Sequence, residues 1–307
     1  MTNDAVTFRV WGLSGSLATE RPEQLRFAEK CLWQRLSEFD AACNRFRADS
    51  ELSQLNDHPG ETVSISDTFE RALLCALDAR DATDGLCDPS VLPALLALGY
   101  DVDFDELRAR RDVSTDAPVA AGGVDAVVLD LSEHTATLSP GCRLDLGATA
   151  KALVADVVAD DVASSGGVVV EVGGDVAVRG RGAQGLWAIG LSDSLHLTGR
   201  EPRVGIEHGG IATSSITART WRASGRVVNH VIDPRTGRCA DGPYATATVS
   251  ATSAAVANAF ATAALLWGEE AGYHVAQAGM AARLIRRDGT VEYVGGWPLD
   301  EEYACSR

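Results

Sequence analysis

The sequence has little positive charge, and almost none of it comes from lysine. Its 307 residues include 27 Lys and Arg against 43 Asp and Glu, which gives a formal net charge of −16 and a pI near 4.7. Lysine stands only at Lys30 and Lys151. Because such a chain repels a phosphate backbone, we expect no nucleic-acid partner.

Long apolar runs are also missing. No run approaches the roughly 18–20 residues that a transmembrane helix needs, so we expect no membrane insertion. The first residues, Met1-Thr2-Asn3-Asp4, carry no basic segment, and no apolar segment follows them as in a signal peptide. We therefore expect a cytoplasmic protein.

Several common chemical signatures are absent. The seven cysteines are scattered and form no C-x-x-C pair, which argues against a disulfide framework or a zinc site. There is no G-x-x-x-x-G-K-[ST], no H-E-x-x-H and no G-x-S-x-G. Residues Gly180–Gly185 match G-x-G-x-x-G, but Leu186–Ile189 then alternates like a strand. We predict a glycine-rich hairpin there and not a dinucleotide-binding loop.

What is present is ordinary globular composition, with 46 % hydrophobic and 23 % charged residues. Periodicity predicts strands near 6–11, 126–131, 135–138, 168–172, 176–179, 186–191, 203–206, 227–232 and 245–251. It predicts helices near 21–39, 148–163, 253–267 and 269–278, a helix that Ser66 or Asp67 caps and that runs through Leu77, and a short helix that ends near 98. We expect Ser50 to cap a short turn to Asn56, and Gly173-Gly174-Asp175 to form a hairpin turn between two strands. Strands in blocks with helices set apart indicate an α+β fold. We expect a single domain over 1–307, with any lobe boundary within 112–124.

Three short motifs carry polar side chains at suggestive spacings, and each has a structural alternative. In Asp145-Leu-Gly-Ala-Thr-Ala-Lys151 an acid and a lysine flank a helix start, or the acid only caps that helix. His230 lies on a predicted strand three residues before Asp233, which suits either a base or a structural histidine. Asn258 and Thr262 share a helix face and suit either magnesium or packing contacts.

The order of the motifs along the chain resembles one family. The series is Phe46…Ser50-Glu-Leu-Ser-Gln-Leu-Asn56, Thr83-Asp-Gly85…Asp88, Asp145…Lys151, Val172-Gly-Gly-Asp175, Ala212-Thr-Ser214…Arg219, His230-Val-Ile-Asp-Pro-Arg-Thr-Gly237 and Asn258…Thr262. It is similar to the ApbE family, the FAD:protein FMN transferases, over nearly the whole chain.

The resemblance implies a fold and an activity. The fold is α+β, with two related lobes of antiparallel sheet and helices and a flavin-nucleotide cleft between them. The activity is magnesium-dependent transfer of FMN from FAD to a Thr or Ser hydroxyl of an acceptor protein, with release of AMP. The implied cofactor is Mg²⁺, and FAD is the substrate.

The resemblance also implies site residues. It assigns FAD contacts to Trp11, Phe46, Leu86, Cys87, Asp88, Asp145, Lys151 and Ile232. It assigns the histidine that acts in the transfer to His230. It assigns the metal ligands to Ala148, through its backbone carbonyl, and to Asn258, Ala261 and Thr262. These residue types suit the chemistry, because pyrophosphate cleavage needs charge neutralisation and the acceptor hydroxyl needs a proton acceptor.

The chain departs from the family pattern at several positions. The family often has an aspartate where this chain has Asn258, and an acid or serine where it has Ala261. Ser215, Asn44 and Ala152 are further departures. An amide keeps an oxygen donor but loses the negative charge, so we expect weaker magnesium binding unless other oxygens complete the shell. Two alternatives follow: an FAD pyrophosphatase that gives FMN and AMP, and a non-catalytic flavin-binding protein.

Overall fold

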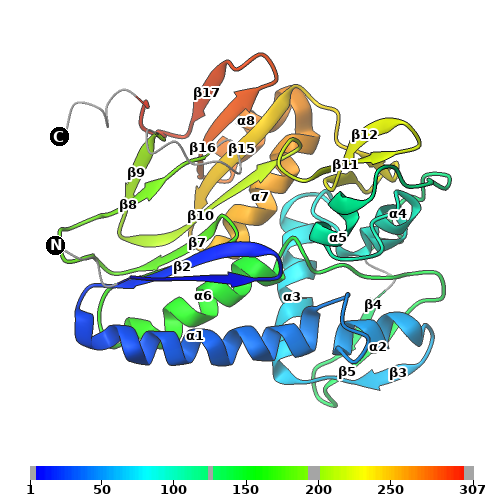
Figure 1. The fold of residues 1–307 in the computed structure, drawn as a ribbon, viewed down its shortest axis with the longest axis horizontal. Helices are drawn as coiled ribbons and strands as arrows, with labels where there is room; N and C mark the ends of the chain where they lie inside the picture. Colours follow the sequence, from blue (N-terminus) through cyan, green and yellow to red (C-terminus); the bar gives the residue numbers. More distant parts are fainter. Residues whose placement is uncertain (1–4, 124–126, 193–200, 301–307) are drawn as a thin grey trace. The chain divides into compact units, whose positions relative to one another are not determined.

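The computed structural model describes residues 5–123, 127–192 and 201–300. The chain divides into two compact units (Figure 1). The first comprises Met1–Gln34, Lys151–Ala218 and Asp241–Arg307, and the second comprises Arg35–Ala150 and Arg219–Ala240. The described part of 112–124 lies within the second unit, and residue 124 lies outside the described residues. Both the single domain and the lobe boundary at 112–124 stay predictions.

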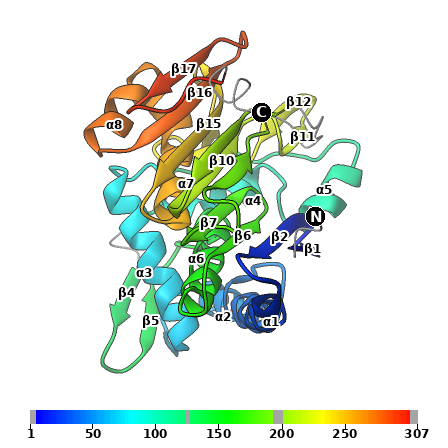
Figure 2. The same ribbon diagram turned by 90° about the vertical axis from the view of Figure 1, so that its left-hand side faces the viewer.

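An eight-stranded sheet forms the first unit, and every pair of neighbouring strands is antiparallel. In spatial order the strands are β1 (Ala5–Val10), β2 (Leu13–Thr19), β6 (Val168–Val172), β7 (Asp175–Arg179), β10 (His208–Ser215), β15 (Tyr244–Ala251), β16 (Ala281–Arg286) and β17 (Val291–Val294). Figure 2 shows this succession from β2 to β17. Helices with antiparallel sheets confirm the predicted α+β class.

Two tight turns lie at the same end of this sheet. Trp11 and Gly12 join β1 to β2 with φ values of 51° and 70°, so β1 ends at Val10 and the chain continues as β2 from Leu13. Gly173 and Gly174 join β6 to β7 with φ values of 66° and 96°, which confirms the predicted hairpin turn. Because Gly15 pairs with Val172, the two turns lie on neighbouring hairpins.

The central strand β10 has no counterpart among the predicted strands. It contains His208-Gly-Gly-Ile-Ala-Thr-Ser-Ser215, whose small residues give no alternating pattern. Gly210 is required there, because a Cβ at this position would lie 2.1 Å from the backbone nitrogen of Ala254. Glycine therefore lets the first turn of α7 (Ala254–Trp267) approach the sheet closely.

Helix α7 packs against β10 and β15 (Figure 1). A carboxylate of α6 (Ala150–Ala163) fixes its first turn: Asp156 accepts hydrogen bonds from the backbone N–H groups of Ala254 at 3.0 Å and Ala255 at 2.9 Å. Arg179 of β7 pairs with the same carboxylate at 3.2 Å. Burial raises the pKa of Asp156, and its three donors oppose that rise.

The remaining elements of the first unit follow the predictions closely. The start of α1 (Pro22–Cys43) lies in this unit, and η3 (Gly268–Glu270) and α8 (Ala271–Gln277) follow α7. Strands β8 (Trp187–Gly190) and β9 (Arg203–Ile206) form a hairpin, whose Val204 and Ile206 share a core with Val176. Gly182 and Gly185 pair across a tight turn, which confirms the glycine-rich hairpin.

The second unit combines short helices with three small sheets. The helices are the end of α1, α2 (Glu51–Asp57), α3 (Asp67–Ala82), η1 (Pro89–Val91), α4 (Leu92–Ala97) and α5 (Phe104–Ala109). The sheets are β3-β5-β4 (Thr62–Ser64, Thr135–Leu138, Val127–Asp130), β11-β12 (Thr220–Ala223, Arg226–Asn229) and β13-β14 (Ile232–Asp233, Arg238–Cys239). Residue 126 of the predicted strand 126–131 lies outside the described residues.

Capping side chains begin two of these helices as predicted. The Ser50 hydroxyl accepts from the Ser53 backbone N–H at the start of α2, and Ser66 does the same for Phe69 at the start of α3. The Glu51 carboxylate also accepts from the backbone N–H and the hydroxyl of Ser66, so the two caps are linked. Each helix start therefore has a side-chain acceptor for one of its free backbone N–H groups.

We predict that Asp156→Ala lowers the free energy of unfolding by about 3 kcal/mol, because two backbone N–H groups and Arg179 lose a buried acceptor. Asp160→Ala is the matched control: Asp160 also pairs with Arg179, but its side chain is 52 % exposed, and we expect a loss below about 1 kcal/mol. Urea unfolding of both variants measures this. Equal losses would contradict a special role for Asp156.

Candidate functional site

In the second unit, Arg45 connects two of the predicted flavin contacts. Its guanidinium lies 4.0 Å from the ring centroid of Phe46 and 4.5 Å from that of Tyr100. Its Nε lies 2.6 Å from a carboxylate oxygen of Asp145, and its Nη1 donates to the Tyr100 backbone carbonyl. The Arg45 side chain is only 8 % exposed, and its Nη2 has no hydrogen-bond partner among the described residues. Phe46, which is largely exposed, thus shares one cation with Asp145.

Asp145 is held on three sides. Its other carboxylate oxygen accepts from the Gly147 backbone N–H at 2.7 Å, and its own N–H donates to Pro89. One residue earlier, Leu144 exchanges two hydrogen bonds with the buried amide of Asn56, at 2.7 and 2.9 Å. The acid therefore does not cap α6, which is the structural alternative, but pairs with Arg45.

The segment Leu86–Asp88 follows a tight turn after α3. Asp84 and Gly85 have φ values of 52° and 81°, and the Thr83 hydroxyl accepts from the Cys87 backbone N–H. All three segment residues are buried. The Asp88 carboxylate accepts from Arg80 at 3.0 Å and from both the N–H and the hydroxyl of Ser90. This side chain thus has protein donors on both oxygens.

His230 does not lie on a strand, which corrects the prediction of a strand over 227–232. β12 ends at Asn229 and β13 begins at Ile232, so His230 occupies the bend between them. The Asn229 side chain makes the bend, because its oxygen accepts from the Val231 N–H while its nitrogen donates to the Ala240 carbonyl. His230 is half-buried there.

Asp233 pairs with the arginine two residues after it. Its two carboxylate oxygens accept from the Arg235 side chain at 2.9 Å each. These hydrogen bonds are the main cause that lowers the pKa of Asp233. The close spacing of His230 and Asp233 in the sequence therefore reflects a turn motif, which ends at Gly237 with a φ of 67°.

Ile232, another predicted flavin contact, is part of a hydrophobic core of the second unit. It packs in a cluster with Leu92, Leu95, Tyr100 and Trp221. Burial raises the pKa of the Tyr100 phenol, although Arg219 and Arg45 oppose the rise. A cavity of about 460 Å³ in this unit is lined by residues that include Arg45 and Phe46. Ala148, a predicted metal ligand, lies in the turn at 147–149 before α6.

In the first unit, the predicted metal ligands Asn258 and Thr262 project from α7, one turn apart. The Asn258 side-chain nitrogen donates to a carboxylate oxygen of Asp175 at 2.8 Å, and the Thr262 hydroxyl lies 3.1 Å from the Ser214 hydroxyl. Asn258 is 6 % exposed, and its Oδ1 has no hydrogen-bond partner among the described residues. Ala261 is fully buried on the same helix.

The other two predicted contacts of the first unit lie at element ends. Trp11 occupies the β1–β2 turn, and Lys151 is the second residue of α6. Both are half-buried.

The donors present fit a hard cation. No group of three His, Cys, Asp or Glu side chains suited to a metal ion occurs in the part of the chain that the structure describes. An amide oxygen, a threonine hydroxyl and backbone carbonyls are the ligands that magnesium accepts, together with water and substrate phosphates. The unpartnered Oδ1 of Asn258 is an open ligand position of this kind.

Sequence reasoning missed Arg45 as a site residue and assigned Asp175 only to a turn. Both make contacts across long stretches of chain, Arg45 with Asp145 and Asp175 with Asn258. A signal for Asp175 exists, because an acid that directly follows a double-glycine turn at the start of an apolar strand is unusual. Nothing in the local pattern marks Arg45.

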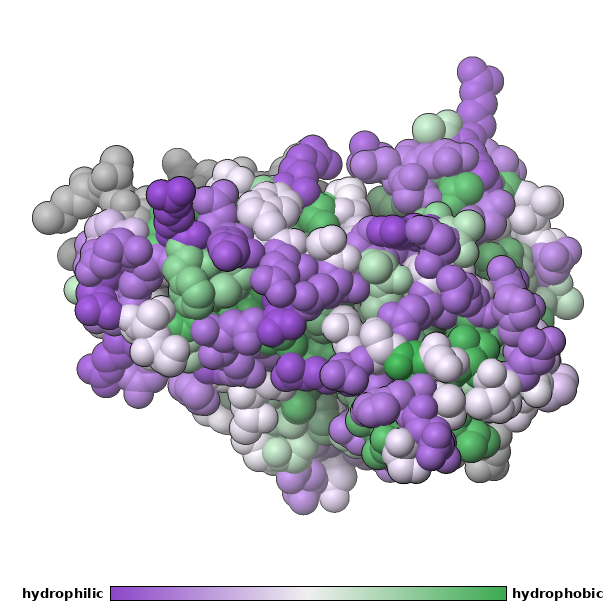
Figure 3. Space-filling model, turned by 90° about the horizontal axis from the view of Figure 1, so that it is seen from below, coloured by the Kyte–Doolittle hydropathy of each residue, from purple (hydrophilic) through white to green (hydrophobic). Residues whose placement is uncertain are grey.

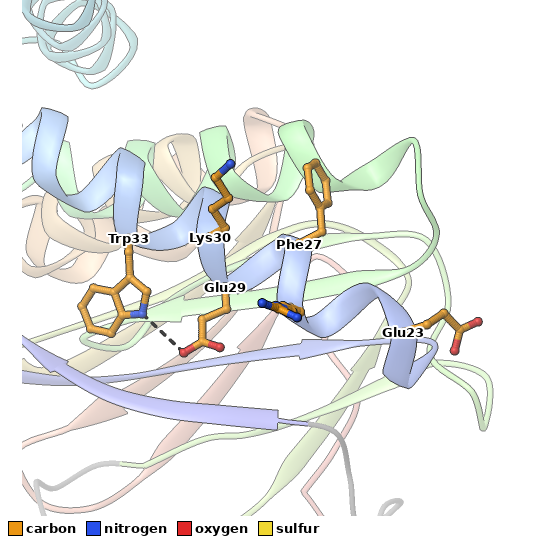
Figure 4. A pocket seen from close by; sticks show the side chains of 6 residues that line it. Glu23, Phe27, Glu29, Lys30 and Trp33 are labelled. Carbon is orange, nitrogen blue, oxygen red and sulfur yellow. Dashed lines mark hydrogen bonds between the residues drawn. The ribbon is translucent and has the colours of Figure 1, made fainter.

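A second hollow lies away from the predicted site residues. A hollow of about 600 Å³ lies on the exposed side of α1, lined by residues that include Phe27, Lys30 and Trp33, and Figure 4 shows these side chains spread along the helix. No predicted site residue lines it. The face in Figure 3 is largely hydrophilic, with hydrophobic atoms in small separate areas. Within the described residues, no helix is both long and apolar enough to span a membrane.

Comparison with known proteins agrees with the fold. The flavin transferase ApbE from Vibrio cholerae superposes with a TM-score of 0.74 at 25 % identity, covering 95 % of this chain and 98 % of that one. The Pseudomonas stutzeri flavinyl transferase ApbE superposes with a TM-score of 0.79 at 20 % identity, covering 100 % and 98 %, which is a similarity of fold alone.

Sequence comparison gives the same result. A Vibrio cholerae protein named FAD:protein FMN transferase is 31 % identical over 267 residues, covering 84 % of this chain and 79 % of the relative. A Haemophilus influenzae protein of the same name is 27 % identical over 252 residues, covering 79 % and 73 %. Residues 6–284 match the ApbE family, and this chain therefore belongs to the ApbE family.

Proposed function

We propose that this chain transfers the FMN part of FAD to a threonine or serine hydroxyl of an acceptor protein, with Mg²⁺ bound and AMP released. Its curated relatives are named FAD:protein FMN transferase, so the chain is a transferase of this class. The observation that carries the metal-dependent part is the buried, unpartnered Oδ1 of Asn258 on α7, one turn from the Thr262 hydroxyl.

The reaction exchanges one phosphorus–oxygen bond for another. The acceptor hydroxyl oxygen bonds to the phosphorus of the FMN half, the bond from that phosphorus to the bridging oxygen breaks, and AMP leaves with that oxygen. Mg²⁺, when bound, neutralises charge on the pyrophosphate oxygens. The proposed ligands are Asn258, Ala261 and Thr262 on α7, and Ala148 through its backbone carbonyl.

His230 is the proposed proton acceptor for the attacking hydroxyl. Its place on a bend favours this role, because a bend held by Asn229 fixes the ring without making it part of a strand ladder. Asp233, three residues later, pairs with Arg235.

The flavin contacts are proposed on both units. In the second unit they are Phe46, Leu86, Cys87, Asp88, Asp145 and Ile232, and in the first they are Trp11 and Lys151. The Arg45 guanidinium lies against the ring of Phe46 and pairs with the Asp145 carboxylate. This supports a site in which an aromatic ring lies near a carboxylate that can accept hydrogen bonds. A cytoplasmic location and the absence of a nucleic-acid partner stay predictions, and the net charge of −16 supports the latter.

We expect the purified protein to release AMP from FAD in the presence of Mg²⁺, to stop when EDTA removes the metal, and to resume with excess Mg²⁺. Chromatography of the nucleotides measures AMP, and flavin fluorescence in denaturing gels measures covalent FMN on co-expressed proteins. AMP with an equal amount of free FMN would instead identify an FAD pyrophosphatase. Bound FAD without AMP, even with co-expressed proteins added, would identify a non-catalytic flavin-binding protein.

We predict that His230→Ala slows transfer by about 10²- to 10⁴-fold and leaves the dissociation constant for FAD within a few-fold. His208→Ala is the control, because His208 is exposed on β10, and it should transfer at the wild-type rate. Single-turnover AMP release and FAD fluorescence titration measure the two quantities. If His230→Ala weakened binding as much as transfer, His230 would be a structural residue.

We predict that Arg45→Ala weakens FAD binding about tenfold, because Asp145 loses the charge that orients it and Phe46 loses the cation beneath its ring. Arg47→Ala removes a neighbouring arginine that forms ion pairs with Asp40 and Asp49, and the variant should bind FAD normally. Fluorescence titration at a temperature well below each Tm measures this. Equal affinities for both variants would exclude Asp145 as a flavin contact held by Arg45.

A further inference from the structure

The amide of Asn258 has a fixed orientation, and Asp175 fixes it. Its Nδ2 donates to Asp175 Oδ1 at 2.8 Å, so Oδ1 must point away from that carboxylate. Both side chains are buried, Asp175 at 2 % and Asn258 at 6 % exposure. A reversed amide would place two oxygens against each other, which a buried carboxylate does not tolerate.

The fixed amide leaves its oxygen without a hydrogen-bond donor among the described residues. A buried polar oxygen without a partner costs about 1–3 kcal/mol, so its retention indicates that something else binds it. The groups next to it on α7 are oxygen donors too, since the Thr262 hydroxyl lies one turn away beside Ser214. Oxygens gathered in this way attract a cation.

Neutral oxygens alone bind a divalent cation weakly, because amides and hydroxyls carry only partial charges. Asp175 brings a full negative charge within one hydrogen bond of the amide. Its position is set by the backbone, since it is the first residue of β7, directly after the Gly173–Gly174 turn, and pairs with Ala212 and Val172. The charge is thus held at a constant place beside α7.

We propose that Asp175 is a positioning residue for the divalent cation of this enzyme: it turns the Asn258 oxygen toward the metal and supplies the negative charge that the amide lacks. The inference rests on the proposed function only in taking Asn258 as a ligand of that cation. Asp175 and Asn258 then act as one pair, a carboxylate and an amide joined by a hydrogen bond. The pair should keep its net charge and its hydrogen bond when the two residue types are exchanged.

The test measures Mn²⁺ affinity by electron paramagnetic resonance of the free ion, with FAD present and no turnover measured. We expect Asp175→Asn to weaken Mn²⁺ binding by about 10- to 100-fold, because the amide–amide hydrogen bond can form but the charge is gone. The exchanged double variant, Asp175→Asn with Asn258→Asp, should recover to within a few-fold of wild type. Asp160→Asn removes one exposed acid of α6 and should bind Mn²⁺ like wild type, which controls for net charge.

The outcomes separate this inference from the proposed function. Wild-type protein that binds FAD but not Mn²⁺ would overturn the metal site itself. Wild-type binding together with an unaffected Asp175→Asn variant would overturn only the role of Asp175. A double variant no better than Asp175→Asn, with an unchanged Tm and unchanged metal-free FAD binding, would also overturn it.

Discussion

The buried carboxylate of Asp156 holds the first turn of α7 in the first unit. It accepts from the first two backbone N–H groups of that helix, and it pairs with Arg179 on the neighbouring strand β7. Without it, the polar start of α7 would lie buried against Gly210 with fewer acceptors than donors. The helix in turn carries Asn258 and Thr262, so the position of the proposed metal ligands depends on a side chain about a hundred residues earlier. The proposed metal ligands can therefore take their places only when the structural carboxylate of Asp156 is present.

The second unit uses the same physical solution with other residues. The Asn56 amide binds both backbone groups of Leu144, and this places Asp145 opposite Arg45. Arg45 is nearly enclosed between two aromatic rings, which limits the directions in which it can present its charge. In both units a buried polar side chain satisfies the backbone of a distant segment, and the next few residues carry the proposed chemistry. A site built in this way is rigid because every polar group that positions it is itself desolvated.

Local patterns predicted those parts of the structure that local physics determines. The Gly173–Gly174 turn, the cap at Ser66 and the course of α6 follow from turn chemistry, capping and helical spacing. The glycine-rich strand β10 did not, because its burial on both faces removes the alternation that marks a strand. The bend at His230 depends on Asn229 reaching Ala240, which no periodicity encodes.

The candidate site divides along the same line. The residue types of the site and their order along the chain could be recognised in the sequence. They indicated the family to which the comparisons assign the chain. Arg45 and the role of Asp175 were not, since each acts through a partner roughly eighty to a hundred residues away. The spacing of residues in the sequence predicts which side chains are neighbours on one helix or strand. A pair between two separate elements forms only when the chain folds. The sequence alone therefore did not explain why an asparagine stands at position 258, whereas its hydrogen bond with Asp175 suggests a reason.

The central claim is that Asn258, held by Asp175, offers its oxygen to a divalent cation, and a crystal structure with FAD and Mn²⁺ tests it most directly. Manganese scatters anomalously, so its position is found without assuming any ligand. We predict an anomalous peak at about 2.0–2.2 Å from Asn258 Oδ1, with the Asn258 nitrogen still donating to Asp175. A peak bound to Asp175 with the amide turned away, or bound FAD with no peak beside α7, would contradict the account.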